Sequence, residues 1–228
     1  MMDALILTVI LTSIPLILAA TGELIAERSG VLNLGVEGMM LMGAVTAFAI
    51  TSLSGNPYLG VMTAAAAGAM TAAIFAVFTL GLATNQVATG LALTIFGTGL
   101  SGLVGAPFVG GTVDGLQAWS IPVLSDLPVL GGLLFQLDLL AYGAFVMLAL
   151  VAWFLNKSRA GLILRAVGNN HDSAHALGYS VLRVRCAAVI FGGLMAGLAG
   201  AYLPLVLTPH WSEGMTAGRG WIALALVV

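Results

Sequence analysis

Residues 137–155 read LDLLAYGAFVMLALVAWFL, and residues 186–207 read CAAVIFGGLMAGLAGAYLPLVL. Each stretch is predominantly apolar and long enough to cross a hydrocarbon core of about 30 Å at roughly 1.5 Å per helical residue. Between them, residues 156–185 hold five of the seven basic residues of the chain, which are Lys157, Arg159, Arg165, Arg183 and Arg185. Two spans joined by a basic loop predict a membrane protein whose loop lies in the cytoplasm.

The composition supports this interpretation along the whole chain. Of its 228 residues, 60% are hydrophobic and 7% are charged, whereas ordinary soluble domains carry about 25% charged residues. Lipid offers no hydrogen-bond partners, so the spans are expected to be helices. The alternating segments of about 10 residues that build a membrane β-barrel do not occur, and no feature indicates nucleic acid binding. The predicted fold is an all-α, polytopic bundle of transmembrane helices.

The hydrophobic pattern predicts one transmembrane domain over residues 1–228, with six complete spans and the start of a seventh. The complete spans are expected at residues 4–22, 39–53, 58–82, 86–106, 137–155 and 186–207. A long connection that contains Pro107, Pro122 and Pro128 covers residues 107–135. The seventh apolar run begins near Trp221 and reaches Val228 before it is long enough to cross, which predicts further helices in the complete protein.

The asymmetry of Lys and Arg sets the expected orientation, because cytoplasmic loops of membrane proteins are enriched in these residues. Placing residues 156–185 inside puts residues 83–85 and 23–38 inside as well. Residues 54–57, residues 107–135 and the N-terminus then lie outside. The outer connection carries Asp114 and Asp126 and no basic residue, which agrees. We expect a multi-pass protein of the bacterial plasma (inner) membrane.

Small residues recur every four positions in two of the spans. Gly97, Ser101 and Gly105 form one series, and Gly193 and Gly197 belong to another. Residues 97–102 also match the G-x-G-x-x-G dinucleotide pattern, but that pattern binds a cofactor only between a strand and a helix. Inside a membrane span, small residues allow helix backbones to approach closely. We therefore predict dense helix packing.

Ser101 leaves an enzymatic alternative open, because GLSG at residues 99–102 resembles the serine motif of intramembrane rhomboid proteases. A serine nucleophile needs a base within hydrogen-bond reach. His171 and His175 fall in the basic loop, and His210 lies beyond Pro209. The single cysteine, Cys186, has no partner for a disulfide or a Cys-rich metal site.

Charged residues are absent from the interiors of the spans at residues 58–82, 86–106 and 186–207. Ion-coupled carriers need titratable or anionic side chains in mid-membrane, so we expect transport to be energised by another component, with an ion-coupled carrier as the alternative. Asn33 and Glu37 are one helical turn apart and either fix the start of a helix or line a path. The polar residues proposed to line a translocation path are Asn33, Glu37, Asn85, Gln86, Thr89 and Thr94.

The basic loop has the pattern of an ordered segment. Asp172 or Ser173 is placed to cap a short helix, Gly178 suits the position just after its end, and Ser180 is placed to cap the next helix. A short capped helix flanked by Arg165 and Arg183 suits docking into a groove of another protein. The alternative is a loop that contacts only anionic lipid headgroups.

Four stretches of the sequence carry a family resemblance. They are ERSGVLNLGVEGMM at residues 27–40, NQVATGLAL at 85–93, IPVLSDLP at 121–128, and GLILRAVGNN at 161–170 with ALG at 176–178. Together they resemble bacterial ABC-importer permeases, in the branched-chain amino acid and simple-sugar permease family and nearest to its nucleoside-type members. The similarity runs through the whole chain in order.

This resemblance implies a transport subunit that is not itself an enzyme and that moves a nucleoside or a simple sugar into the cytoplasm. The implied partners are a second, homologous permease, two cytoplasmic ATPase subunits and an extracytoplasmic substrate-binding protein. No cofactor is implied in this chain, since ATP and Mg would bind the ATPases. The resemblance further implies that part of the basic loop is a coupling segment that fits a cleft of the ATPase, with contacts from Arg165, Gly168, His171, Asp172, Ala174, Leu177 and Gly178.

Overall fold

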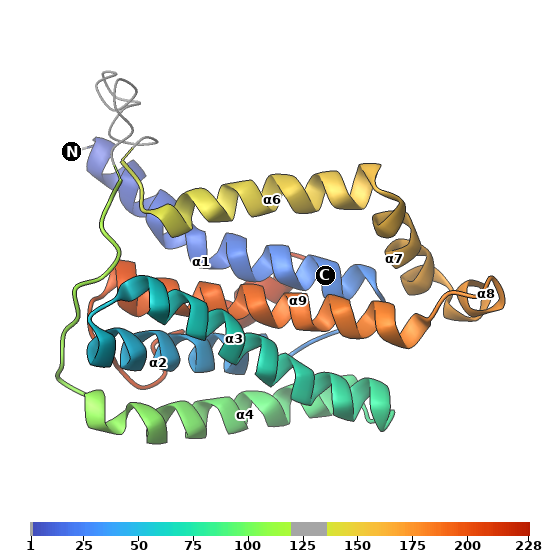
Figure 1. Ribbon diagram of the computed structural model, residues 1–228, viewed down its shortest axis with the longest axis horizontal. Helices are drawn as coiled ribbons and strands as arrows, with labels where there is room; N and C mark the ends of the chain where they lie inside the picture. The colour runs from blue at the N-terminus through green and yellow to red at the C-terminus, as the bar shows by residue number, and fades with distance from the viewer. Residues whose placement is uncertain (1, 120–135) are drawn as a thin grey trace.

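The computed structural model describes residues 2–119 and 136–228, and this part of the chain contains six helices long and apolar enough to span a membrane. The prediction of an all-α, polytopic bundle is confirmed (Figure 1). The spanning helices are α1 (Met2–Arg28), α2 (Val36–Ser54), α3 (Pro57–Ala76), α4 (Gln86–Gly105), α6 (Leu139–Lys157) and α9 (Val181–Tyr202). The π-helical segments η1 (Val77–Gly81) and η3 (Leu203–Leu207) prolong α3 and α9, and the 3₁₀ turn η2 (Ala106–Phe108) ends α4. Three shorter helices are α7 (Arg159–Asn169), α8 (His171–Ala176) and α10 (Arg219–Ala225).

Helices α2 and α9 form the centre of the bundle. Helix α9 packs on α1, α2 and α3, whereas α4 packs mainly on α2, and α6 packs on α1 and α7. The largest fully buried side chains include Tyr202 on α9 and Phe48 and Met39 on α2. The peripheral helices α4 and α6 therefore leave much of their apolar surface to the lipid.

Close backbone contacts at glycines hold these central helices together. Gly193 of α9 lies against Gly68 of α3, and Gly97 of α4 lies against Gly38 of α2. A Cβ added at Gly200 would collide with the carbonyl oxygen of Met40. The predicted role of the small-residue series in helix packing is confirmed.

The first span is longer than predicted. We expected it to end at Gly22 and a polar inner loop to begin at Glu23, but α1 continues to Arg28 with Pro15 inside it. The prediction was wrong because Glu23 was taken as a loop residue, whereas its side chain is 1% exposed and accepts a hydrogen bond from a neighbouring segment. The helix predicted to begin after Ser180 is confirmed, because α9 begins at Val181 and carries Arg183 and Arg185. Helix α7 lies within the predicted basic loop.

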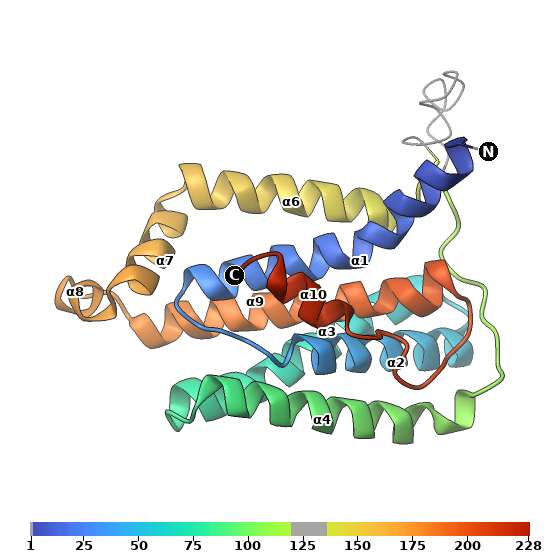
Figure 2. The same ribbon diagram turned by 180° about the vertical axis from the view of Figure 1, so that it is seen from behind.

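Two non-helical segments return into the bundle from opposite ends (Figure 2). Residues 29–35 turn back from the end of α1 before α2 begins, and residues 208–218 turn back from the end of η3 before α10 begins. Helix α10, which contains the predicted start of a seventh span at Trp221, packs on α1 and α2. Two helices therefore start at positions inside the bundle.

The connections between helices gather at two ends of the molecule. Helices α7 and α8 and the turn between η1 and α4 lie at one end, and the start of α1 and the turn between α2 and α3 lie at the other (Figure 1). This arrangement agrees with the predicted alternation of crossings. Within the predicted connection at residues 107–135, Leu116 N–H donates to the carbonyl of Leu205 at 2.8 Å, and residues 120–135 lie outside the described residues.

Candidate functional site

Helix α7 is fixed to the end of the bundle by two glycines. Gly161 lies against the carbonyl of Phe154, and Gly168 lies against the carbonyl of Arg28 at the end of α1. Leu164 and Val167 are buried on the same side of the helix. An added Cβ at either glycine would collide with backbone atoms, so the two glycines allow α7 to pack closely against the ends of α1 and α6.

The cap of helix α8 differs from the prediction. Asn170, in an extended conformation, accepts a hydrogen bond from Ser173 N–H at 3.0 Å, so the expectation that Asp172 or Ser173 caps this helix was wrong. The amide side chain of Asn170 and its extended backbone satisfy the requirements of an N-cap one residue before the helix begins. Gly178 has a φ of +87°, as predicted for the residue after the helix. Ser180 does precede α9, but its side chain makes no capping hydrogen bond.

Helix α8 presents both polar and apolar side chains away from the bundle. His171 and Asp172 are exposed, and 3.5 Å separates His171 Nε2 from Asp172 Oδ1. Ala174 is buried, whereas Leu177 is 77% exposed and Tyr179 is 41% exposed. Exposed apolar side chains such as Leu177 and Tyr179, grouped on a basic, membrane-flanking segment, are typical of a surface that contacts another protein.

Helices α7 and α9 both contact the non-helical residues that lead into the bundle. Arg185 Nε of α9 donates a hydrogen bond to the carbonyl of Ser29 at 3.0 Å. The next residue, Gly30, has a φ of +85° and lies between Arg185 and Gly168 of α7. Arg165 also lies on α7, and its Nε is buried without a hydrogen-bond partner among the described residues. A displacement of α7 would therefore act on the first residues of the 29–35 segment.

Side chains of α1 and α4 hold the backbone of this segment. Gln86 Oε1 accepts a hydrogen bond from Leu32 N–H at 2.8 Å, and Thr94 Oγ1 donates to the carbonyl of Leu34 at 3.0 Å. Glu23 Oε1 accepts from Asn33 N–H at 3.1 Å, and its Oε2 is buried with no partner in the described part of the chain. These bonds satisfy backbone groups that would otherwise be orphaned inside the bundle.

Glu37 of α2 holds the second non-helical segment, residues 208–218, in a similar way. Its Oε1 accepts hydrogen bonds from the hydroxyl of Thr216 at 2.6 Å and from Gly218 N–H at 2.7 Å. Its Oε2 accepts from Gly220 N–H at 2.7 Å. One carboxylate on α2 thus holds the start of α10 through three hydrogen bonds.

The structure brings together only part of the predicted path-lining set. Asn33 and Thr94 are buried at the 29–35 segment, where Asn33 Oδ1 accepts from Gly35 N–H at 3.0 Å. Asn85 is exposed and caps α4, and Thr89 pairs with the hydroxyl of Thr84 at 2.9 Å. Sequence reasoning missed Glu23; the signal was the apolar Leu-Ile-Ala that follows it without a break. Whether these residues line a path stays a prediction.

A pocket at the basic end links Gln86 to the α7–α8 segment. It has a volume of about 440 Å³ and lies between η1, α8 and α9. The polar residues in its lining are Thr79, Gln86, His175, Ser180 and Arg185. Residues of the proposed path and of the proposed coupling segment therefore border the same cavity.

The position of Ser101 does not favour nucleophilic catalysis. Its side chain is fully buried on α4, and its hydroxyl donates to the carbonyl of Thr98 at 3.0 Å. Among the residues that the structure describes, no hydrogen bond joins Ser101 to a histidine. Its surroundings are those of a helix-packing residue.

Comparison with known proteins assigns the chain to a family. Residues 5–228 match the family described as branched-chain amino acid transport system, permease component. The chain belongs to this permease family. It is 44% identical over 217 residues to a protein of Haloferax volcanii provisionally named a glucose ABC transporter permease. It is also 30% identical to a nucleoside ABC transporter permease of Lactococcus lactis and 31% identical to a guanosine ABC transporter permease of Bacillus subtilis.

These alignments cover 93%, 100% and 94% of this chain and 66%, 75% and 71% of the respective relatives. No solved structure matches it. The family and the six apolar spans make this a multi-pass protein of the plasma membrane and a transport component, not an enzyme. The predicted family is confirmed, and the family assignment supports the permease over the intramembrane protease.

Proposed function

We propose that this permease is the membrane subunit of an ATP-driven importer and that it carries a nucleoside or a simple sugar into the cytoplasm. The solute class rests on the names of relatives, which include nucleoside, guanosine and glucose permeases. Both solute classes are small and polar.

The observation that carries this proposal is the contact between the α7–α8 segment and the non-helical residues of the bundle. Gly168 of α7 lies against Arg28 at the end of α1 and against Gly30 of the non-helical segment, and Arg185, at the start of α9, donates a hydrogen bond to the carbonyl of Ser29. ATP binding and hydrolysis on a partner would shift the coupling segment and thereby change the relative stability of inward-open and outward-open arrangements. The chain itself performs no chemistry on the solute.

The proposed partners follow from the family and from the shape of the coupling segment. ABC permeases of this family work with ATPases and solute-binding proteins. For this chain, we propose two ATPase subunits at the basic end, a second, homologous permease beside the bundle, and a substrate-binding protein at the opposite end. The coupling contacts would come from Arg165, Gly168, His171, Asp172, Ala174, Leu177 and Gly178, with ATP and Mg on the ATPases.

Leu177→Asp tests the docking of the coupling segment. Leu177 is 77% exposed, so the substitution should leave the fold intact while placing a charge in the proposed interface. We expect ATPase copurification with the complete permease to fall by roughly tenfold or more, together with ATP-dependent solute uptake.

Leu53→Asp is the matched control, because Leu53 is 75% exposed and lies at the end of α2, away from α7 and α8. It should retain the ATPase. Unchanged ATPase copurification in the Leu177→Asp protein would contradict the docking proposal. Uptake that persists without any ATPase and collapses with the proton gradient would instead favour an ion-coupled carrier.

A further inference from the structure

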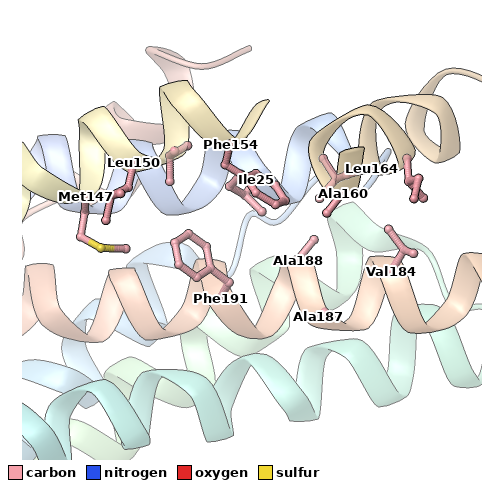
Figure 3. Close-up of a pocket in the computed structure, with 12 residues that line it drawn as sticks. Ile25, Met147, Leu150, Phe154, Ala160, Leu164, Val184, Ala187, Ala188 and Phe191 are labelled. Atoms are coloured by element: carbon pink, nitrogen blue, oxygen red, sulfur yellow. The ribbon is translucent and has the colours of Figure 1, made fainter. Parts of the chain in front are cut away.

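An apolar groove lies between α6 and α9. Side chains of α6, including Met147, Leu150 and Phe154, face Ala187 and Phe191 of α9 (Figure 3). Ile25 of α1 lies behind them, and α7 closes one end with residues that include Ala160 and Leu164. The groove has a volume of about 500 Å³, which is within the range of roughly 300–1,000 Å³ found for ligand pockets.

Three cations lie within three residues in sequence of side chains that line this groove. Lys157 and Arg159 lie at the corner between α6 and α7, directly before Ala160 in the lining. Arg183 lies four residues before Ala187 on α9 and therefore shares its face of the helix. All three are exposed, and the ion pairs among the described residues are made by other side chains. The apolar lining is therefore flanked in the chain by exposed basic residues of α6, α7 and α9.

We propose that this groove binds one acyl chain of an anionic phospholipid of the cytoplasmic leaflet, with the headgroup held by Lys157, Arg159 and Arg183. The apolar lining matches a hydrocarbon chain and offers no hydrogen-bonding groups to a polar solute. Basic pockets between transmembrane helices on the cytoplasmic side are suited to anionic headgroups. The site is separate from the 29–35 segment and is not needed for the proposed transport function.

The side chains of the groove favour a lipid over a helix of a partner permease as its occupant. Close helix–helix contacts in lipid are enriched in small residues. Here small residues line only the α7 and α9 sides of the groove, at Ala160, Ala187 and Ala188, whereas the α6 wall carries bulky side chains that include Met147 and Phe154. An acyl chain fits between bulky side chains, and its headgroup neutralises the cations. The structure therefore favours a lipid as the occupant.

Photolabelling tests the proposal directly. The purified protein would be placed in nanodiscs with phosphatidylglycerol that carries a diazirine in its acyl chain, and labelled peptides would be mapped. We expect labelling to concentrate in residues 147–154 and 184–191 and to be competed by phosphatidylglycerol more strongly than by phosphatidylcholine. Even labelling of all lipid-facing helices, or crosslinks at the groove to a second permease, would overturn the proposal.

Two substitutions separate the acyl-chain site from the headgroup site. Ala187→Phe should fill the groove and abolish the concentrated labelling, whereas Ala66→Phe, at an exposed position of α3, should leave it unchanged. Arg183→Gln should weaken phosphatidylglycerol binding about fivefold while phosphatidylcholine binding stays constant. Equal labelling in wild-type and Ala187→Phe proteins, measured on samples with the same thermal stability, would show that the groove is not the site.

Discussion

At the scale of single residues, two buried carboxylates organise the interruptions in the helix bundle. Glu23 holds Asn33 N–H in the first non-helical segment, and Glu37 holds Thr216, Gly218 and Gly220 in the second. Buried charges are costly unless they receive hydrogen bonds. Glu37 accepts three such hydrogen bonds, and all three come from residues 216–220. Its carboxylate therefore anchors the start of α10.

Removing the Glu37 carboxylate should loosen the start of α10. Glu37→Ala leaves Gly218 and Gly220 N–H without their acceptors, and we expect a local destabilisation of about 3 kcal/mol, or roughly a hundredfold in the opening equilibrium. Hydrogen exchange of residues 216–222 would measure it. Glu213→Ala, at an exposed carboxylate in the same connection, is the control. Unchanged protection of Gly218 and Gly220 would show that Glu37 does not anchor this segment.

At the scale of helices, stability depends on backbone contacts at glycines. The apolar faces that face the lipid gain nothing by association with other helices, so close packing supplies the stabilisation. Gly200 against Met40 and Gly193 against Gly68 are the clearest contacts on α9. This helix accordingly contacts three of the other spanning helices.

Adding a methyl group at Gly200 should separate α9 from α2. We expect Gly200→Ala to destabilise the purified protein by about 1–3 kcal/mol through overpacking, visible as a lower Tm in detergent. Gly143→Ala provides the comparison, because a Cβ at Gly143 of α6 meets nothing within 4 Å. That change should be neutral or stabilise by up to about 1 kcal/mol, since alanine favours a helix. Equal Tm values for the two variants would contradict the packing account.

Helical spans were predictable because hydropathy over about 20 residues is a strong local signal. The start of α4 at Gln86 and the turn after α8 at Gly178 were found correctly from the sequence. The end of α1 was not, because a buried glutamate near a span boundary has the same local pattern as a loop residue. Its burial depends on Asn33, ten residues away, and hydropathy carries no information about that contact.

Several polar residues of the candidate site could be identified from the sequence, but their hydrogen-bond partners could not. Asn33, Glu37, Gln86 and Thr94 were identified as polar residues near spans. Their partners are backbone groups of Leu32, Leu34, Gly35, Gly218 and Gly220, together with the hydroxyl of Thr216. Those partners lie up to 183 positions away in the chain. Only the fold shows that the polar side chains secure two interruptions of the bundle.

At the scale of the whole molecule, the connections predicted to be cytoplasmic lie at one end of the bundle, and those predicted to be outside lie at the other (Figure 1). The end with α7 and α8 carries the exposed Leu177 and most of the basic residues. The account therefore requires this end to face the cytoplasm and to contact the ATPase. The opposite end, which includes the start of α1, would face the solute-binding protein.

Site-specific photocrosslinking from position 177 tests this requirement most directly. A photoreactive amino acid would replace Leu177 in the complete permease in intact cells, and the same residue would replace Leu53 in a control. The account predicts a crosslink to the ATPase from position 177 and none from position 53. Failure of position 177 to crosslink the ATPase in a transport-competent complex, or its crosslinking to the solute-binding protein, would contradict it.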